Sequence, residues 1–136
     1  MSGYLLVRAD GRAYGLPLAR VVAVDELGEV LEVPSLVAAL RGLTPRRGRL
    51  VPLVHLGALL GDRAPPAERG RAAVFVDLDS GSRVVALEVD DADEVVRAQA
   101  LPVPPGESLP FAGGVVQRPD ALVPILDLTR LESRLP

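Results

Sequence analysis

The sequence lacks cysteine, lysine and tryptophan, and it contains a single histidine, His55. The absence of cysteine excludes a disulfide framework, thiolate metal ligands and a cysteine nucleophile. The absence of lysine excludes Schiff-base chemistry and a lysine general base. His55 has no nucleophile or carboxylate partner in a recognisable pattern, and glycine-rich phosphate motifs are missing. We therefore predict that the protein is not an enzyme, with no catalytic residue, metal site or cofactor.

Aromatic residues and long apolar runs are also scarce. Aromatics make up only 3% of the chain although 49% of it is hydrophobic, so valine, leucine and alanine must build the core. No apolar run approaches the ~18 residues of a membrane-spanning helix. The first residues, MSGYLLVRADG, lack the basic region and cleavage site of a signal peptide. We expect a cytoplasmic protein of one domain, residues 1–136, without direct membrane insertion.

The chain has no surplus of positive charge, since its formal net charge is −3. Proteins that bind nucleic acid without sequence preference are usually basic and stack bases on aromatic rings, so we do not expect a nucleic-acid partner. One segment differs: RRGRLVPLVHL, residues 46–56, places Arg46, Arg47 and Arg49 around a glycine. An alternative hypothesis is therefore a small SH3- or OB-like barrel that binds nucleic acid or another protein through this arginine hairpin.

The hydrophobic pattern is mostly that of short strands. Residues 4–18 predict a hairpin with its turn at Asp10-Gly11, and residues 72–91 predict another with its turn at Asp79-Ser80-Gly81. Residues 33–43 predict a short helix that ends at Gly42, and the acidic stretch 88–94 predicts a solvated turn or a helix start. Thirteen glycines and thirteen prolines between many short strands favour small barrels.

An internal repeat is the most informative pattern. Residues 50–59, LVPLVHLGAL, align with residues 122–131, LVPILDLTRL, and five positions are identical. The same shift places Gly42 on Gly114 and Arg46 on Arg118, and it aligns His55 with Asp127. Two copies of one strand plan predict two similar, intertwined lobes within one domain, roughly residues 14–70 and 71–136.

Four segments together resemble the CheW family of chemotaxis coupling proteins. They are YGLPLARVVAV, VPSLVAALRGLTPRRGRLVPLVHL, VVALEVDDADEVV and GGVVQRPDALVPILDLTRL, in family order over roughly residues 4–135. The pair Arg47-Gly48, followed by Val51-Pro52, is the most specific piece. The resemblance implies a mainly β fold, with two small five-stranded SH3-like β-barrel lobes and short helices.

The resemblance also implies a function and a binding surface. Family members have no catalytic activity and connect the cytoplasmic tip of chemoreceptors to the regulatory domain of a CheA-type histidine kinase in signalling arrays. Arg47 matches the family arginine that is important for coupling, and Val21 and Val24 match hydrophobic positions near the receptor-facing surface. The residues expected to contact partners are Arg47, Gly48, Val21, Val24, Val51 and Pro52.

Several family positions hold a different residue in this chain. A family glutamate is replaced by Ala23, a family asparagine by Pro45, and a family valine by Ala92. A family aspartate is replaced by His55, for which a structural role is the expectation. These departures suggest a divergent or accessory coupling protein.

Overall fold

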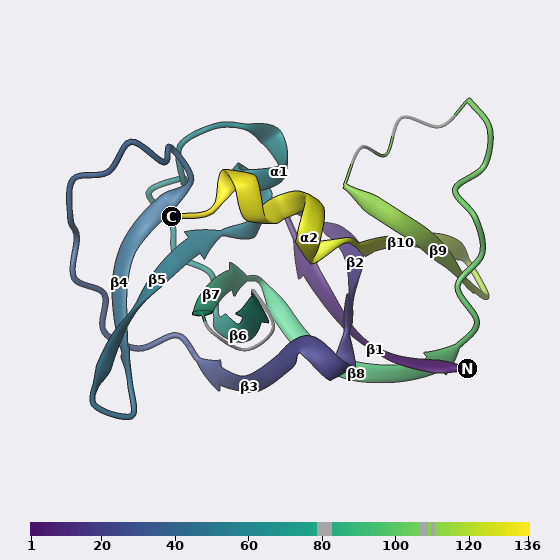
Figure 1. The fold of residues 1–136 in the computed structure, drawn as a ribbon, viewed down its shortest axis with the longest axis horizontal. Coiled ribbons are helices and arrows are strands. Elements are labelled where there is room, and N and C mark those ends of the chain that lie inside the picture. The colour runs from purple at the N-terminus through teal and green to yellow at the C-terminus, as the bar shows by residue number, and fades with distance from the viewer. Residues whose placement is uncertain (79–82, 107–108, 110) are drawn as a thin grey trace.

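Ten strands form two sheets of five in the computed structural model, which describes residues 1–78, 83–106, 109 and 111–136 (Figure 1). The first sheet has the order β8-β1-β2-β10-β9 and the second has the order β3-β6-β7-β5-β4. The strands are β1 (Ser2–Ala9), β2 (Arg12–Pro17), β3 (Val21–Glu26), β4 (Leu40–Arg46), β5 (Arg49–His55), β6 (Ala72–Leu78), β7 (Arg83–Val89), β8 (Asp91–Ala98), β9 (Ala112–Arg118) and β10 (Ala121–Leu126). The short helical segments are η1 (Leu18–Arg20), α1 (Leu56–Gly61), α2 (Leu128–Leu131) and η3 (Glu132–Arg134). The predicted mainly β fold is confirmed, with each lobe an open, curled sheet.

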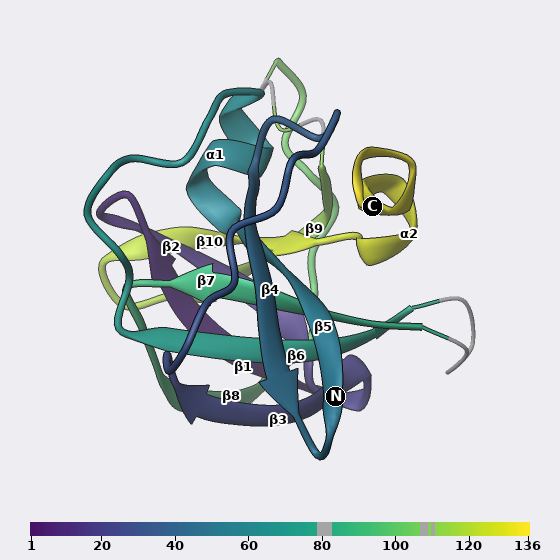
Figure 2. The same cartoon turned by 90° about the vertical axis from the view of Figure 1, so that its left-hand side faces the viewer.

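Each of the two sheets contains strands from both halves of the chain. The first sheet combines β1 and β2 with β8, β9 and β10, whereas the second combines β3, β4 and β5 with β6 and β7. The lobes therefore do not follow the predicted ranges 14–70 and 71–136, because β6 and β7 join the strands that precede them. Sequence similarity identifies equivalent strands, but hydrogen bonding between distant segments decides which strands share a sheet. Figure 2 shows β5, β6 and β7 next to one another.

The strands correspond pairwise between the two sheets, in agreement with the repeat. β5 pairs in parallel with β7, and β10 pairs in parallel with β2. Each of β5 and β10 follows an antiparallel partner, β4 or β9, and leads into a short helix. Gly42 and Gly114 also have equivalent surroundings, since each lies beside an isolated bridge, Leu31 with Leu43 and Leu101 with Val115.

At Gly42 the backbone of the segment that precedes β4 passes close to the strand. A Cβ atom at this position would lie 2.3 Å from the carbonyl oxygen of Leu31, compared with 2.9 Å between a Cβ at Gly114 and the oxygen of Leu101. We predict that Gly42→Ala lowers the free energy of unfolding by about 1–3 kcal/mol, because the bridge must move apart. Urea denaturation measures the effect, and Gly114→Ala is expected to cost less. Equal stability of wild type and Gly42→Ala would contradict the prediction.

One hydrophobic core joins the two sheets. Its largest cluster contains Leu5 and Leu16 of the first sheet together with Val54 and Val74 of the second. The C-terminal segment adds Leu128, Leu131 and Leu135 to the same cluster. In Figure 1 this segment, drawn in yellow, runs from the end of β10 towards β5, so it lies across the junction between the lobes. The buried residues of this cluster are aliphatic, as the scarcity of aromatics predicts, whereas Phe75 and Tyr4 are buried in two smaller clusters.

The local predictions have mixed outcomes. The turn at Asp10-Gly11 joins β1 to β2, as predicted, whereas the turn at 79–81 lies outside the described residues. The helix predicted over 33–43 is wrong: β4 begins at Leu40, and residues 33–39 form no regular element. Of the two alternatives predicted within 88–94, the helix start is wrong because β8 begins at Asp91, whereas a bend at Asp90 separates β7 from β8. In both segments strand pairing, which depends on distant residues, overrides local helix signals.

Candidate partner-binding surface

The tip of the β4–β5 hairpin consists of Arg47 and Gly48. Their φ angles of 50° and 76° are both positive, as in the two-residue type I′ turn that matches the twist of paired strands. Arg46 and Arg49 face each other as the last paired residues. An arginine with positive φ costs about 1 kcal/mol relative to glycine, asparagine or aspartate at such a position. Arg47 is nevertheless present and exposed, which favours a role outside folding.

A shallow cavity of about 520 Å³ lies beside this tip. It is lined by Val22, Arg46, Arg47, Arg49, Leu50, Val51, Arg83 and Val84. We call this surface the arginine patch. Val22 and Leu50 are 48% and 56% exposed, so the patch combines accessible apolar side chains with four arginines.

Three arginines of the patch have no acidic partner among the residues that the structure describes. Among the described residues, Arg46, Arg47 and Arg49 form no ion pair with a carboxylate, whereas Arg41 and Arg118 pair with Glu88 and Glu94 elsewhere. The Arg46 guanidinium lies 5.1 Å from the centre of the Phe75 ring, and its buried Nε has no hydrogen-bond acceptor within the described part of the chain. The patch is therefore positive on a protein of negative net charge.

The structure brings only some of the predicted contact residues together at the surface. Val24 is 40% exposed on β3, and Arg47 and Gly48 are exposed at the hairpin tip. Val21 is half-buried against the main core, and Val51 is 8% exposed within a second apolar cluster, so both contribute to packing. Pro52 is half-buried.

Val22 is the exposed residue of β3 that sequence reasoning missed. Side chains alternate along a strand, and in β3 Val21 and Ala23 are half-buried while Val22 and Val24 are exposed. The alternation of side chains along a strand predicts that Val22 and Val24 share a face. Residues 21–24 are all small and apolar, however, so their sequence does not show which of the two faces is exposed. Ala23 pairs with Phe75, the ring beneath Arg46. In the family pattern this position holds a glutamate. With alanine there, residue 23 supplies no carboxylate near Arg46.

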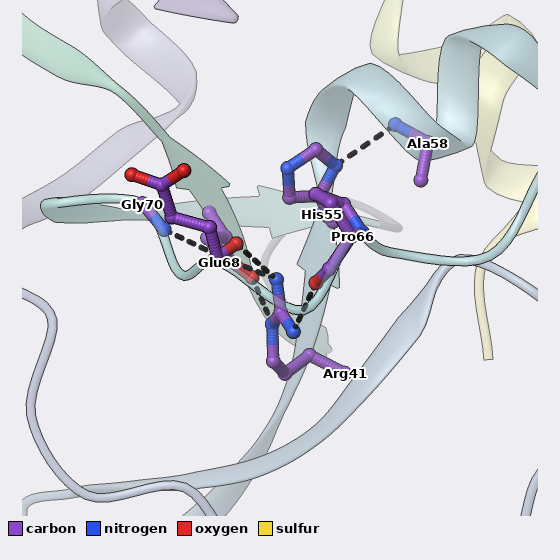
Figure 3. A network of polar contacts seen from close by, with 7 residues as sticks. Arg41, His55, Ala58, Pro66, Glu68 and Gly70 are labelled. Carbon is purple, nitrogen blue, oxygen red and sulfur yellow. Dashed lines mark hydrogen bonds and ion pairs between the residues drawn. The ribbon is translucent and has the colours of Figure 1, made fainter. Parts of the chain in front are cut away.

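A buried ion pair joins Arg41 of β4 to Glu88 of β7, the two strands on either side of β5. The Arg41 Nε donates to Glu88 Oε1 at 2.7 Å, and Nη2 donates to Oε2 at 3.0 Å. The same guanidinium donates to the carbonyls of Pro66 and Glu68, and the Gly70 amide donates to Glu88 Oε2 at 2.6 Å (Figure 3). The pair holds the 63–71 loop against the second sheet.

The sequence indicates no special role for Glu88, because this residue is the first of an ordinary acidic stretch. In the structure its side chain is fully buried while Asp91 is exposed. A buried carboxylate requires a partner, and that partner, Arg41, is 47 residues away. No group of three or more histidine, aspartate or glutamate side chains in the described ranges is arranged to hold a metal ion.

His55 is buried at the end of β5 and is the capping residue that precedes helix α1. Its Nδ1 accepts a hydrogen bond at 3.0 Å from the Ala58 amide, and Figure 3 shows the imidazole turned towards that residue. The equivalent Asp127 accepts from the Thr129 amide at the start of α2. Both residues therefore cap a short helix, which agrees with the structural role expected for His55. Strand alternation alone suggests an exposed or edge position for His55, but in the structure the residue is only 5% exposed.

The environment of His55 favours the neutral imidazole. Burial lowers its pKa below the ordinary value, and the positive charges of Arg41 and Arg63 act in the same direction. Glu88 and Asp10 oppose this shift without overcoming it. A neutral Nδ1 is also what the cap requires, since a protonated nitrogen cannot accept the amide hydrogen.

We predict that the stability of the protein falls as the pH drops below about 6.5, the value for an unperturbed histidine. In this range the unfolded chain binds a proton at His55 that the folded chain resists, so protonation favours unfolding. His55→Asn keeps a capping acceptor without a titratable ring. Urea midpoints at pH 7.5 and 5.5 should therefore differ less for His55→Asn than for wild type. An equal pH dependence of the two proteins would contradict the prediction.

Comparison with known proteins bears on what this fold and surface are for. The model of the CheW-like domain family matches residues 3–135, which is nearly the whole chain. The chain belongs to the CheW-like domain family. Members of this family are non-enzymatic adaptors of chemotaxis signalling, and in that general sense the chain is a coupling adaptor. A search of curated proteins finds no match.

A solved structure supports the fold of this CheW-like chain. The scaffolding protein TtCheW from Thermoanaerobacter tengcongensis superposes with a TM-score of 0.80 at 20% sequence identity. The alignment covers 96% of this chain and 86% of that one. No helix in the described ranges is both long and apolar enough to cross a membrane.

Proposed function

We propose that this CheW-like protein couples chemoreceptors to a CheA-type histidine kinase in the cytoplasm. The observation that carries the proposal is the arginine patch, where Arg47 is exposed at a strained turn beside accessible apolar side chains. In this proposal the patch contacts the regulatory domain of the kinase. The exposed Val24 of β3, which does not line the patch, contacts the tip of the receptor.

Calorimetric titration of the protein with the regulatory domain of a CheA-type kinase from the same organism tests this function. We expect binding in the micromolar range, and we expect Arg47→Asn to weaken it at least tenfold. Asparagine tolerates positive φ, so this variant keeps the hairpin turn while it removes the guanidinium. Arg69→Asn, at an exposed arginine of the 63–71 loop, serves as the control.

The two proposed interfaces are separable in the same experiment. Val24→Gln should weaken binding to a receptor-tip fragment and leave binding to the kinase domain unchanged, because Val24 does not line the arginine patch. Absence of binding to every CheA-type regulatory domain of the organism would refute the coupling function. Undiminished kinase binding by Arg47→Asn would refute the assignment of the patch to the kinase.

A further inference from the structure

The arginine patch has the composition of a site for acidic groups. Arg47 and Arg49 are exposed on either side of Gly48, and neither is neutralised by a carboxylate within the described part of the chain. Arg46 is fixed over Phe75 and has an unsatisfied Nε. Val22 and Leu50 place accessible apolar surface in the same cavity. A matching ligand must therefore supply both negative charge and an apolar side chain.

We propose that the arginine patch binds a segment of a partner protein in which acidic residues flank one apolar side chain. The inference rests on the proposed function only in taking the partner to be a protein. The guanidinium group presents two parallel donors that match the two oxygens of a carboxylate, so several arginines favour carboxylates over neutral polar groups. The apolar side chain of the segment covers Val22 and Leu50, which removes hydrophobic surface from water.

The positive patch lies on a protein of negative net charge, and this contrast favours binding of an acidic partner at the patch. The protein as a whole carries a net charge of −3, so an acidic partner is repelled by most of the surface. Within about 10 Å, the screening distance at moderate salt, the arginines of the patch reverse the sign of the local field. The hairpin therefore orients an acidic segment towards Val22 and Leu50 and disfavours other approaches.

A nucleic-acid strand also carries negative charge, but it fits the patch less well. Single strands are held by stacking on aromatic rings, and Phe75, the ring beneath Arg46, is only 3% exposed. The exposed groups between the arginines are aliphatic, and they offer a base no planar surface. The negative net charge also opposes the extended backbone of a long strand.

NMR titration of the isotope-labelled protein with short capped peptides tests this inference. The probe is Glu-Glu-Leu-Glu-Glu, and the matched control is Gln-Gln-Leu-Gln-Gln. We expect millimolar binding of the acidic peptide, with amide shifts concentrated at Val22, residues 46–51 and Val84. The control peptide should bind at least tenfold more weakly, and 0.5 M NaCl should reduce binding of the acidic peptide.

Variants of the protein and a third probe complete the experiment. The double variant Arg47→Glu/Arg49→Glu should lose the shifts, whereas Arg69→Glu should retain them. Equal binding of the two peptides, shifts centred outside the patch, or no shifts at all would overturn the inference. Tighter binding of a twelve-residue oligothymidylate than of the acidic peptide would overturn it in favour of a nucleic-acid site.

Failure of this inference is distinguishable from failure of the coupling function. Kinase-domain binding without any response to the acidic peptide would leave the function in place and refute the recognition chemistry. Peptide binding at the patch without affinity for any CheA-type domain would support the recognition chemistry and direct the search to other acidic proteins.

Discussion

Glu88→Ala is expected to lower the free energy of unfolding by about 3–5 kcal/mol, the typical cost of removing one partner from a buried ion pair. The reason is the Arg41 guanidinium, whose side chain is only 9% exposed and would lose both of its carboxylate contacts. The Gly70 amide would lose its acceptor as well. Urea denaturation followed by circular dichroism measures the loss.

The control for this prediction is the paired replacement Arg41→Met/Glu88→Leu. It removes both charges and leaves no buried ion without a partner, so it should destabilise the protein less than Glu88→Ala alone. Glu29→Ala, at an exposed glutamate, should change stability by less than about 0.5 kcal/mol. A cost below about 1 kcal/mol for Glu88→Ala would show that water replaces the lost contacts.

Leu131→Ala is expected to cost about 2–5 kcal/mol and to destabilise both lobes together. Leu131 is fully buried in α2, in the cluster that also contains Leu16 of the first sheet and Val74 of the second. Because the cavity opens in a core shared by both sheets, neither lobe can retain its packing while the other unfolds. Thermal unfolding followed by calorimetry measures the loss and its cooperativity.

Two observations decide whether the lobes act as one unit. Calorimetric and van't Hoff enthalpies of Leu131→Ala should agree, as they do for a two-state transition. Leu122→Ala, at a 52% exposed leucine of β10, should change the melting temperature far less. Two separate transitions in the Leu131→Ala variant would contradict the view that one core stabilises both lobes.

The pattern of short strands, the repeat and the family were predictable from the sequence because each depends on the order of residue types along the chain and not on which segments come into contact. The Asp10-Gly11 turn follows from residues that tolerate positive φ. The repeat aligned His55 with Asp127, and both residues cap helices. The helix expected over 33–43 failed because the local signals of Pro34, Ser35 and Gly42 compete with pairing to a strand further along the chain.

The candidate site was predictable only in part, for a similar reason. The family resemblance predicted Arg47 as a contact residue. It did not predict Val22 or Arg83, because these residues line the arginine patch only once folding places β3 and β7 near the β4–β5 hairpin. Val21 and Val51 have the same residue type as Val22, yet they are largely packed inside. The exposure of a strand residue depends on which face of the strand another element covers. A run of valines does not indicate which face that is.

The sequence by itself determined the composition of the core, the repeated strand plan, the capping of the short helices and membership of the CheW-like domain family. Tertiary structure alone decided which strands the two halves exchange, that Glu88 is buried against Arg41, and that four arginines surround Val22 and Leu50. The physical reason is the range of the interactions. Turns and caps form between near neighbours, whereas sheets, buried ion pairs and surface patches join residues that the chain brings together only on folding.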